Sequence, residues 1–298
     1  MNEIEVSPAM VASANEKFIL TVTCPDTIGI VAATSTFFAE NGAFISESVH
    51  YGDSETERFF LRTVFSKGAD NWPGIVAIRE GMQDIAKRFD MDWKIYNASE
   101  KPRVMVAVSR FGHCLNDLLH AWVTGRLPIE ISAVVSNHDD FRKLVEMHDV
   151  PFHHLPVNKD NKREQEKQIL ILMGDTNSEL LVLARYMQVL TEEMCEDLKG
   201  RCINIHHSFL PSFKGAKPYQ QAHARGVKLI GATAHYVTSD LDEGPIIEQD
   251  AERVTHNHST AELVEVGRHV ETGVLNRAVR WHCERRVMLN GHKTIVMR

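Results

Sequence analysis

The chain has 298 residues, of which 43% are hydrophobic, and a formal net charge of −7. That length exceeds what one core usually organises, so two domains are expected. A nucleic-acid-binding surface requires clustered Lys and Arg, whereas the basic residues here are scattered among acidic ones. No apolar stretch reaches the roughly 18 residues of a membrane span, and the first residues lack the pattern of a secretory signal.

The five cysteines are an odd number and include no Cys-x-x-Cys pair. This argues against a disulfide framework and against a zinc ribbon, and it favours a reducing, cytoplasmic location. The histidines at 153–154 and at 256 and 258 lack the spacing of known zinc motifs. We therefore expect no metal site.

Residues 1–97 are expected to form a ferredoxin-like domain after a loose N-terminal arm of about 14 residues. A run of strand formers ends at Pro25, and apolar residues at helical spacing follow Gly29 until Asn41 and Gly42 close that helix. The predicted elements are a strand at 18–23, a helix at 28–41, strands at 43–51 and 58–65, a helix at 72–89 and a strand at 91–96. This βαββαβ order is that of the ferredoxin-like fold.

A polar linker at 97–102 marks the boundary to a second domain over residues 102–298. Its first strand is almost continuously apolar, as expected where helices cover both faces of a sheet. The predicted elements are strands at 103–108, 129–136, 152–155, 180–187 and 202–206, and helices at 115–124, 141–148 and 159–175. Ser259 and Glu262 form a capping box at the start of a final long helix. The alternation predicts a doubly wound, mostly parallel α/β domain.

Asn204 and His206 occupy alternate positions at the end of an apolar strand, so both side chains leave the same face. Asp242 follows in a loop that ends at Gly244 and Pro245. Open α/β sheets bind ligands beyond the carboxyl ends of their strands. These three residue types, without a Ser or Cys nucleophile in reach, indicate proton transfer and oxyanion binding at a carbonyl group, not covalent catalysis.

The residues around this set resemble the folate-dependent formyltransferase family. The resemblance rests on Asn204-Ile205-His206, Ser208-x-Leu210-Pro211, residues 231–235 and residues 240–247. It implies that Asn204, His206 and Asp242 are catalytic and that no cofactor is needed, since 10-formyltetrahydrofolate is the substrate. It also implies a folate pocket formed by Met187, Gln188, Val189 and Leu190, closed on its other side by Thr238 and Leu241.

Residues 24–31 resemble the ACT domain, a βαββαβ module that often binds amino acids. The resemblance implies an amino-acid effector near Asp26, Ile28 and Gly29. It also implies a subunit interface, in which two such domains form an eight-stranded sheet in a homo-oligomer (a dimer or a tetramer). These two roles remain open at this point.

An ACT domain joined to a formyltransferase-like domain is similar to a branch of that family that hydrolyses 10-formyltetrahydrofolate. Residues 204–207, 215–219 and 293–296 carry this similarity. It implies release of formate and tetrahydrofolate for purine and one-carbon metabolism. Alternation turns His207 to the opposite face from His206, where a structural role and a role in the site are both open.

Two alternative functions are considered. The first is formyl transfer to an amine such as glycinamide ribonucleotide, whose phosphate is held in related enzymes by a loop rich in Gly and Ser. The corresponding loop at 109–114 has one Gly and bulky neighbours, so backbone N–H groups cannot crowd around a phosphate, and water is favoured as acceptor. The second is a catalytically idle sensor of folate or amino acids, which the presence of all three catalytic residues disfavours.

Overall fold

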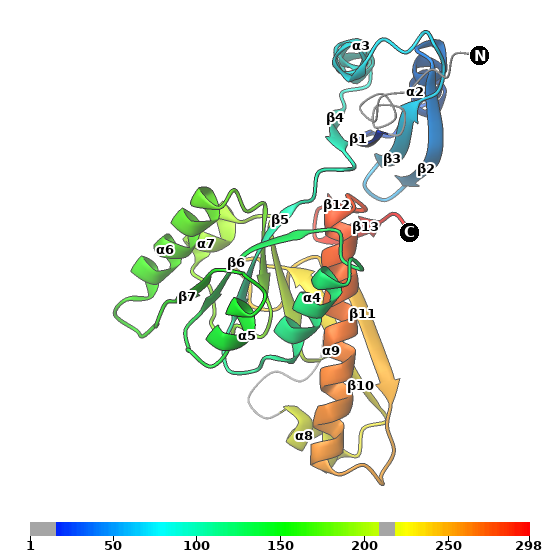
Figure 1. The fold of residues 1–298 in the computed structure, drawn as a ribbon. Helices are drawn as coiled ribbons and strands as arrows, with labels where there is room; N and C mark the ends of the chain where they lie inside the picture. The colour runs from blue at the N-terminus through cyan, green and yellow to red at the C-terminus, as the bar shows by residue number, and fades with distance from the viewer. Residues whose placement is uncertain (1–15, 209–217) are drawn as a thin grey trace, which may run out of the picture. The chain divides into compact units, whose positions relative to one another are not determined.

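The computed structural model describes residues 16–208 and 218–298, which form two compact units. The first unit extends to Glu100 and includes Glu284–Asn290 and Ile295–Arg298; the second contains Lys101–Cys283 and Gly291–Thr294. The predicted loose arm and the motif residues Leu210, Pro211 and 215–217 lie outside the described residues. Figure 1 shows the helices and strands of both units.

The first unit has a four-stranded antiparallel sheet in the order β2-β3-β1-β4. The βαββαβ order predicted from the sequence is confirmed. Gly29, with φ 98°, starts the first helix in a conformation that a glycine adopts without steric cost. The elements are β1 (Lys17–Pro25), α2 (Ile30–Glu40), β2 (Ala43–Asp53), β3 (Arg58–Lys67), α3 (Ile75–Arg88) and β4 (Asp92–Asn97).

Both faces of the central strand β3 are buried, and different parts of the chain cover them. Leu61 and Phe65 pack in a core with Phe38 of α2 and Met82 of α3. On the other face, Phe60 packs against Met288 and Met297, which lie in the last residues of the chain. These C-terminal residues group with the first unit, although the sequence assigns them to the second domain, because their packing on Phe60 removes apolar surface from water.

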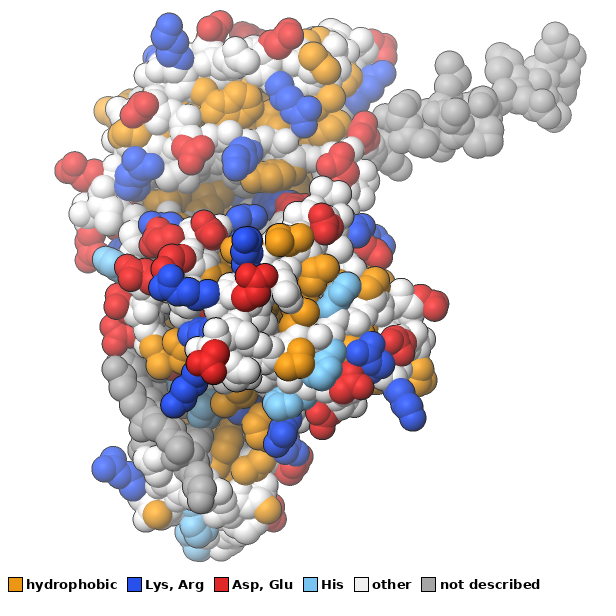
Figure 2. All heavy atoms as spheres, turned by 90° about the vertical axis from the view of Figure 1, so that its left-hand side faces the viewer, with side chains coloured by type: hydrophobic (Ala, Val, Ile, Leu, Met, Phe, Trp, Pro, Cys, Tyr) orange, Lys and Arg blue, Asp and Glu red, His pale blue; other side chains and the backbone are white. Residues whose placement is uncertain are grey.

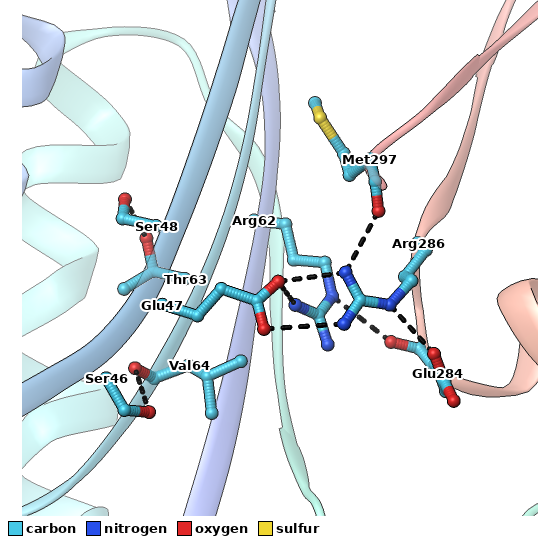
Figure 3. Close-up of polar contacts among 9 residues, drawn as sticks. All are labelled: Ser46, Glu47, Ser48, Arg62, Thr63, Val64, Glu284, Arg286 and Met297. Carbon is cyan, nitrogen blue, oxygen red and sulfur yellow. Dashed lines mark hydrogen bonds and ion pairs between the residues drawn. The ribbon is translucent and has the colours of Figure 1, made fainter.

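Glu47 joins the same C-terminal residues to the sheet through charge. Its carboxylate accepts hydrogen bonds from Arg62 (2.7 Å) and Arg286 (2.8 Å), as Figure 3 shows. The side chain of Arg62 is only 4% exposed and also donates to the carbonyl oxygen of Glu284 at 3.1 Å. Because loss of one partner leaves an uncompensated buried charge, such clusters are far more costly to break than surface ion pairs. The associated hairpin, β12 (Val287–Asn290) and β13 (Lys293–Val296), was not predicted from the sequence.

The second unit is a seven-stranded sheet in the order β11-β10-β9-β8-β5-β6-β7. Strands β5 to β9 pair in parallel, whereas β10 is antiparallel to both β9 and β11. The predicted mostly parallel, doubly wound α/β fold is confirmed, with helices on both sides of the sheet (Figure 1). The elements are β5 (Arg103–Val108), α4 (His113–Val123), β6 (Glu130–Ser136), α5 (Arg142–Glu146), β7 (Phe152–His154), α6 (Lys162–Asp175), β8 (Leu180–Leu183), α7 (Glu192–Asp197), β9 (Cys202–His206), α8 (Pro218–Arg225), β10 (Leu229–Tyr236), β11 (Ile246–Arg253) and α9 (Thr260–Cys283).

Two sequence predictions at element ends have different outcomes. The capping box of α9 is confirmed, because the Ser259 N–H donates to Glu262 at 2.7 Å and the Glu262 N–H donates to the Ser259 hydroxyl at 3.3 Å. The strand predicted over 180–187 is wrong at its end, since β8 stops at Leu183. Arg185 and Met187 have φ values of 64° and 56°, which a strand cannot contain.

On the face drawn in Figure 2, basic and acidic side chains are intermingled. Among residues 16–208 and 218–298, no helix has the length and apolar character needed to cross a membrane.

Candidate active site

The three predicted catalytic side chains lie together at the carboxyl end of β9. Asn204 and His206 leave one face of this strand, while Ile203 and Ile205 are buried on the other. Asp242 comes from the loop between β10 and β11, and its Oδ2 lies 3.2 Å from Nδ1 of His206. The geometry is that of a histidine whose ring is oriented by a carboxylate.

The backbone of the β10–β11 loop presents Asp242 to His206 in a constrained conformation. Asp242 itself adopts φ 58°, in the left-handed region that non-glycine residues seldom occupy. Two residues later, a Cβ on Gly244 would lie 1.8 Å from the carbonyl oxygen of Tyr236. The loop therefore requires Gly244 in order to fold back against β10, and this close approach fixes the position of Asp242.

His235 is a fourth member of the site, and sequence reasoning assigned it no role. It lies directly opposite Asn204 in the antiparallel pairing of β10 with β9. Its Nδ1 faces the carbonyl oxygen of Tyr236 at 2.9 Å, which only accepts, so Nδ1 carries the proton. Its Nε2 lies 3.2 Å from the amide nitrogen of Asn204 and 3.7 Å from Oδ1 of Asp242. This contact uses one side of the Asn204 amide nitrogen and leaves an N–H group for a ligand.

Asp242 is the charged centre of this group. Burial alone would raise its pKa, but hydrogen bonding to His206 and the nearby His235 ring hold the pKa of the Asp242 carboxyl well below its usual range. A permanently ionised carboxylate keeps the proton of His206 on Nδ1. The opposite nitrogen, Nε2, lies 2.9 Å from the hydroxyl of Ser208, so the expectation that no Ser lies within reach of the catalytic residues is wrong.

His207 does not turn away from His206 as strand alternation predicts. The two rings stack with centroids 4.8 Å apart, because β9 ends at His206 and its alternation ends there too. Burial, followed by the charge of Arg185, lowers the pKa of His207 to about 4, so this ring is neutral at physiological pH. His207 therefore supports His206 through packing and adds no positive charge beside it.

A buried polar cluster lies next to His207. The carboxylate of Glu271 accepts from Tyr219 at 2.8 Å, contacts His113 at 2.7 Å and pairs with Arg185 at 3.3 Å. Arg185 also lies over the ring of Phe111, 5.4 Å from its centroid. Side chains thus fill the surroundings of the loop at 109–114.

Part of this cluster has the composition of a metal site. In the part of the chain that the structure describes, His113, Cys114 and Glu271 bring potential ligand atoms within 4.8 Å of one another. However, Arg185 already neutralises Glu271, and a metal cation would be repelled by the guanidinium group. Burial, followed by the charge of Glu271, raises the pKa of Cys114 well above its usual value, so the thiolate that a metal prefers is not available.

A pocket opens beside the catalytic side chains and holds most of the residues predicted to contact folate. Five of them line it, and Met187 does not. Asn204, His235 and Asp242 form its polar wall. The lining of predicted folate residues consists of Gln188, Val189, Leu190, Thr238 and Leu241. The pocket thus places apolar side chains, on which a flat ring could pack, next to the carboxylate of Asp242.

The three residues predicted to bind an effector lie at the turn between β1 and α2. Ile28 is 98% exposed, and Gly29 is the N-cap residue of α2. The carboxylate of Asp26 lies against Gly52, where a Cβ would approach its Oδ2 to 2.4 Å. The effector role of these residues remains a prediction.

The fold and the site define a formyl-transfer domain, and comparison with known proteins agrees. Residues 102–279 match the family model described as formyl transferase. A glycinamide ribonucleotide transformylase from Symbiobacterium toebii has a similar structure, with a TM-score of 0.63 and 27% identity, over 68% of this chain and 97% of that one.

Greater similarity covers both units of the chain. Formyltetrahydrofolate deformylase from Corynebacterium sp. (strain P-1) is 49% identical over 287 residues, which are 96% of this chain and 100% of that protein. The crystal structure of formyltetrahydrofolate deformylase from Burkholderia mallei matches with a TM-score of 0.91 and 49% identity, over 95% of this chain and 100% of that one. The chain belongs to the formyltetrahydrofolate deformylase family.

Proposed function

We propose that the chain hydrolyses 10-formyltetrahydrofolate to formate and tetrahydrofolate and so supplies formate for purine and one-carbon metabolism. The observation that carries this proposal is the arrangement of Asn204, His206 and Asp242 beside a pocket with one polar wall and one partly apolar side, in a chain of this family. The substrate contains an amide-like formyl group on an aryl nitrogen, which is the kind of carbonyl that such a site can activate. The steps use these side chains and water.

In the first step, water attacks the formyl carbon while Nε2 of His206 takes a proton from it. Asp242 keeps the Nδ1 proton in place and stabilises the imidazolium that forms, as its lowered pKa supports. The carbonyl oxygen becomes an oxyanion, and the free N–H of Asn204 donates to it. The result is a tetrahedral intermediate bound between Asn204 and His206.

In the second step, the bond between the formyl carbon and N10 breaks. His206 returns its proton to N10, so tetrahydrofolate leaves with a neutral nitrogen. The formyl carbon leaves as formic acid, which ionises in water to formate. One water is consumed, and neither an oxidant nor a covalent enzyme intermediate is needed.

The rival reaction, formyl transfer to an amine acceptor, has less support. An acceptor phosphate would require a loop with free backbone N–H groups, whereas here Phe111 packs on Arg185 and His113 contacts Glu271. An idle sensor has still less support, since Asp242 is held at a constrained φ against His206.

One assay tests the proposed reaction. Incubation of the full-length protein with 10-formyltetrahydrofolate and no amine acceptor is expected to release formate and tetrahydrofolate in equal amounts. The formate is measured with a coupled dehydrogenase, and the tetrahydrofolate by chromatography. Tetrahydrofolate that appears only after glycinamide ribonucleotide is added, together with the formylated amine and without formate, would instead identify a transferase.

We further propose that the first unit assembles copies of the chain in the cytoplasm and binds an amino acid at Asp26, Ile28 and Gly29. The support is that β2 is an edge strand of its sheet and carries two exposed aromatic side chains, Phe44 and Tyr51. Light scattering is expected to give the mass of a dimer or tetramer. Glycine, methionine or serine is expected to change the rate of formate release, and identical rates with all three would leave only assembly.

A further inference from the structure

The segment 187–190 supplies three residues to one side of the folate pocket, and its backbone conformation is not one that these residues adopt by local preference. They lie between the end of β8 and the start of α7 and belong to neither. Arg185 and Met187 are both left-handed. Within residues 16–208 and 218–298, the backbone of 187–190 makes no hydrogen bond to other residues. Such a conformation persists only when its surroundings hold it.

The residue before this segment, Tyr186, is anchored by side chains from two other elements. The amide of Gln165, from α6, donates to the Tyr186 hydroxyl and also to the carbonyl oxygen of Leu155 at 3.2 Å. The hydroxyl of Ser109, at the end of β5, contacts the carbonyl oxygen of Tyr186. Both Tyr186 and Gln165 are buried, so water cannot replace these bonds readily.

The residue after the segment, Thr191, is anchored by Glu166, which follows Gln165 in α6. The carboxylate of Glu166 accepts from the Thr191 N–H at 2.9 Å and from its hydroxyl at 2.5 Å. Thr191 in turn caps α7 by accepting from the Met194 N–H at 3.4 Å. Glu166 is buried, and burial of a carboxylate is unfavourable unless hydrogen bonds compensate for it.

Two adjacent buried polar residues of α6 therefore hold the two ends of one four-residue segment. The backbone N–H and C=O groups of 188–190 are left available in the pocket wall, where they can pair with the polar edge of a bound ring. A shift of either end would move all of these groups together.

We propose that Gln165 and Glu166 are positioning residues for recognition of the folate ring. Neither residue lines the pocket, and both act by fixing the backbone of 187–190 in the conformation that binds the ring. This inference rests on the proposed function, because it takes the pocket to be the folate site. It predicts that their loss weakens folate binding while the chemistry at His206 and Asp242 continues.

Glu166→Leu in the full-length protein tests the inference. We expect the dissociation constant for 5-formyltetrahydrofolate, a stable folate that is not turned over, to rise about tenfold, as for loss of a hydrogen bond to a charged group. KM for 10-formyltetrahydrofolate should rise in parallel, with kcat changed less than about threefold. Glu166→Gln, which retains an acceptor for the Thr191 N–H, is expected to restore most of the binding.

The matched control is Glu164→Leu, the same substitution at an exposed position of α6, which should leave both constants unchanged. If Glu166→Leu does not fold, the pair Gln165→Met and Tyr186→Phe replaces it. Each of these two variants should weaken folate binding. Both remove the hydrogen bond between Gln165 and the Tyr186 hydroxyl, so the double variant should have a dissociation constant no higher than that of the weaker-binding single variant.

Two results would overturn the inference. One is a lower melting temperature with unchanged folate binding in all these variants, which would make the cluster purely structural. The other is a fall in kcat at constant KM, which would place its effect on the chemistry. Wild-type protein that binds 5-formyltetrahydrofolate but releases no formate would refute the proposed reaction alone, and wild-type protein that binds no folate would refute both.

Discussion

Asp242→Asn is expected to lower kcat for formate release by about 10³–10⁴-fold. Asn has the size of Asp but no charge, so it neither fixes the proton of His206 on Nδ1 nor stabilises the imidazolium that forms during attack. The effect should fall on kcat and not on KM. Asp242 belongs to the polar wall of the pocket, and the substitution leaves the apolar residues that line the pocket unchanged. Stopped-time formate assays with saturating substrate measure this change.

The matched control is Asp240→Asn in the same loop, where the side chain is exposed. This variant should retain wild-type kcat within about twofold, as surface substitutions normally do. The dissociation constant for 5-formyltetrahydrofolate should be similar in both variants and the wild type. If Asp242→Asn keeps its turnover, Asp242 is not the partner of His206 in the reaction.

Asp242→Asn should also change how the free energy of unfolding depends on pH. The pKa of Asp242 is lowered in the folded protein, so its ionised form stabilises the fold above the unfolded-state pKa of about 3.9. This contribution is lost as pH falls below that value toward the folded-state pKa. The difference in unfolding free energy between wild type and Asp242→Asn should therefore shrink in acid, and denaturant titrations at neutral and acidic pH measure it.

Asn204→Asp is expected to lower kcat by about 10²–10³-fold, the usual effect of removing one oxyanion donor. The change keeps the shape of the side chain but replaces the N–H group that faces the ligand with a carboxylate oxygen. That oxygen repels the negative charge that develops on the formyl oxygen. KM should change far less than kcat, because the interaction forms mainly in the transition state.

Asn257→Asp makes the same substitution at an exposed loop position and should have no effect on either constant. A second comparison uses the pocket itself: Asn204→Asp and wild type should bind 5-formyltetrahydrofolate with similar affinity. If kcat is preserved and only KM rises in Asn204→Asp, the residue holds the substrate and does not stabilise the oxyanion.

The catalytic site was predictable where it depends on local periodicity. Asn204 and His206 share a face because they are two positions apart in one strand, and this alternation is visible in the sequence. Asp242 joins them through the long-range return of β10, and here the family resemblance supplied what spacing alone does not. His235 was missed because its contact with Asn204 depends on the register between β9 and β10.

Other features could not be read from local patterns because their causes lie far away in the chain. The apolar run through residues 180–187 has the composition of a strand, yet its last residues leave the strand conformation. Gln165 and Ser109 form hydrogen bonds with Tyr186, and the residues on either side of Tyr186 have positive φ values. The hairpin of β12 and β13 is too short to show periodicity, and its apolar partner Phe60 lies more than two hundred residues earlier.

The contact of Phe60 with Met288 and Met297 also sets an order of events during synthesis. A ribosome releases residues 16–100 first, but one face of their sheet keeps Phe60 and Arg62 uncovered until residues 284–298 emerge. The whole of the second unit is made in between, and domains generally fold as they are released. The unit that begins with residues 16–100 is therefore completed after the second unit, and the face around Phe60 lacks its C-terminal cover during that interval.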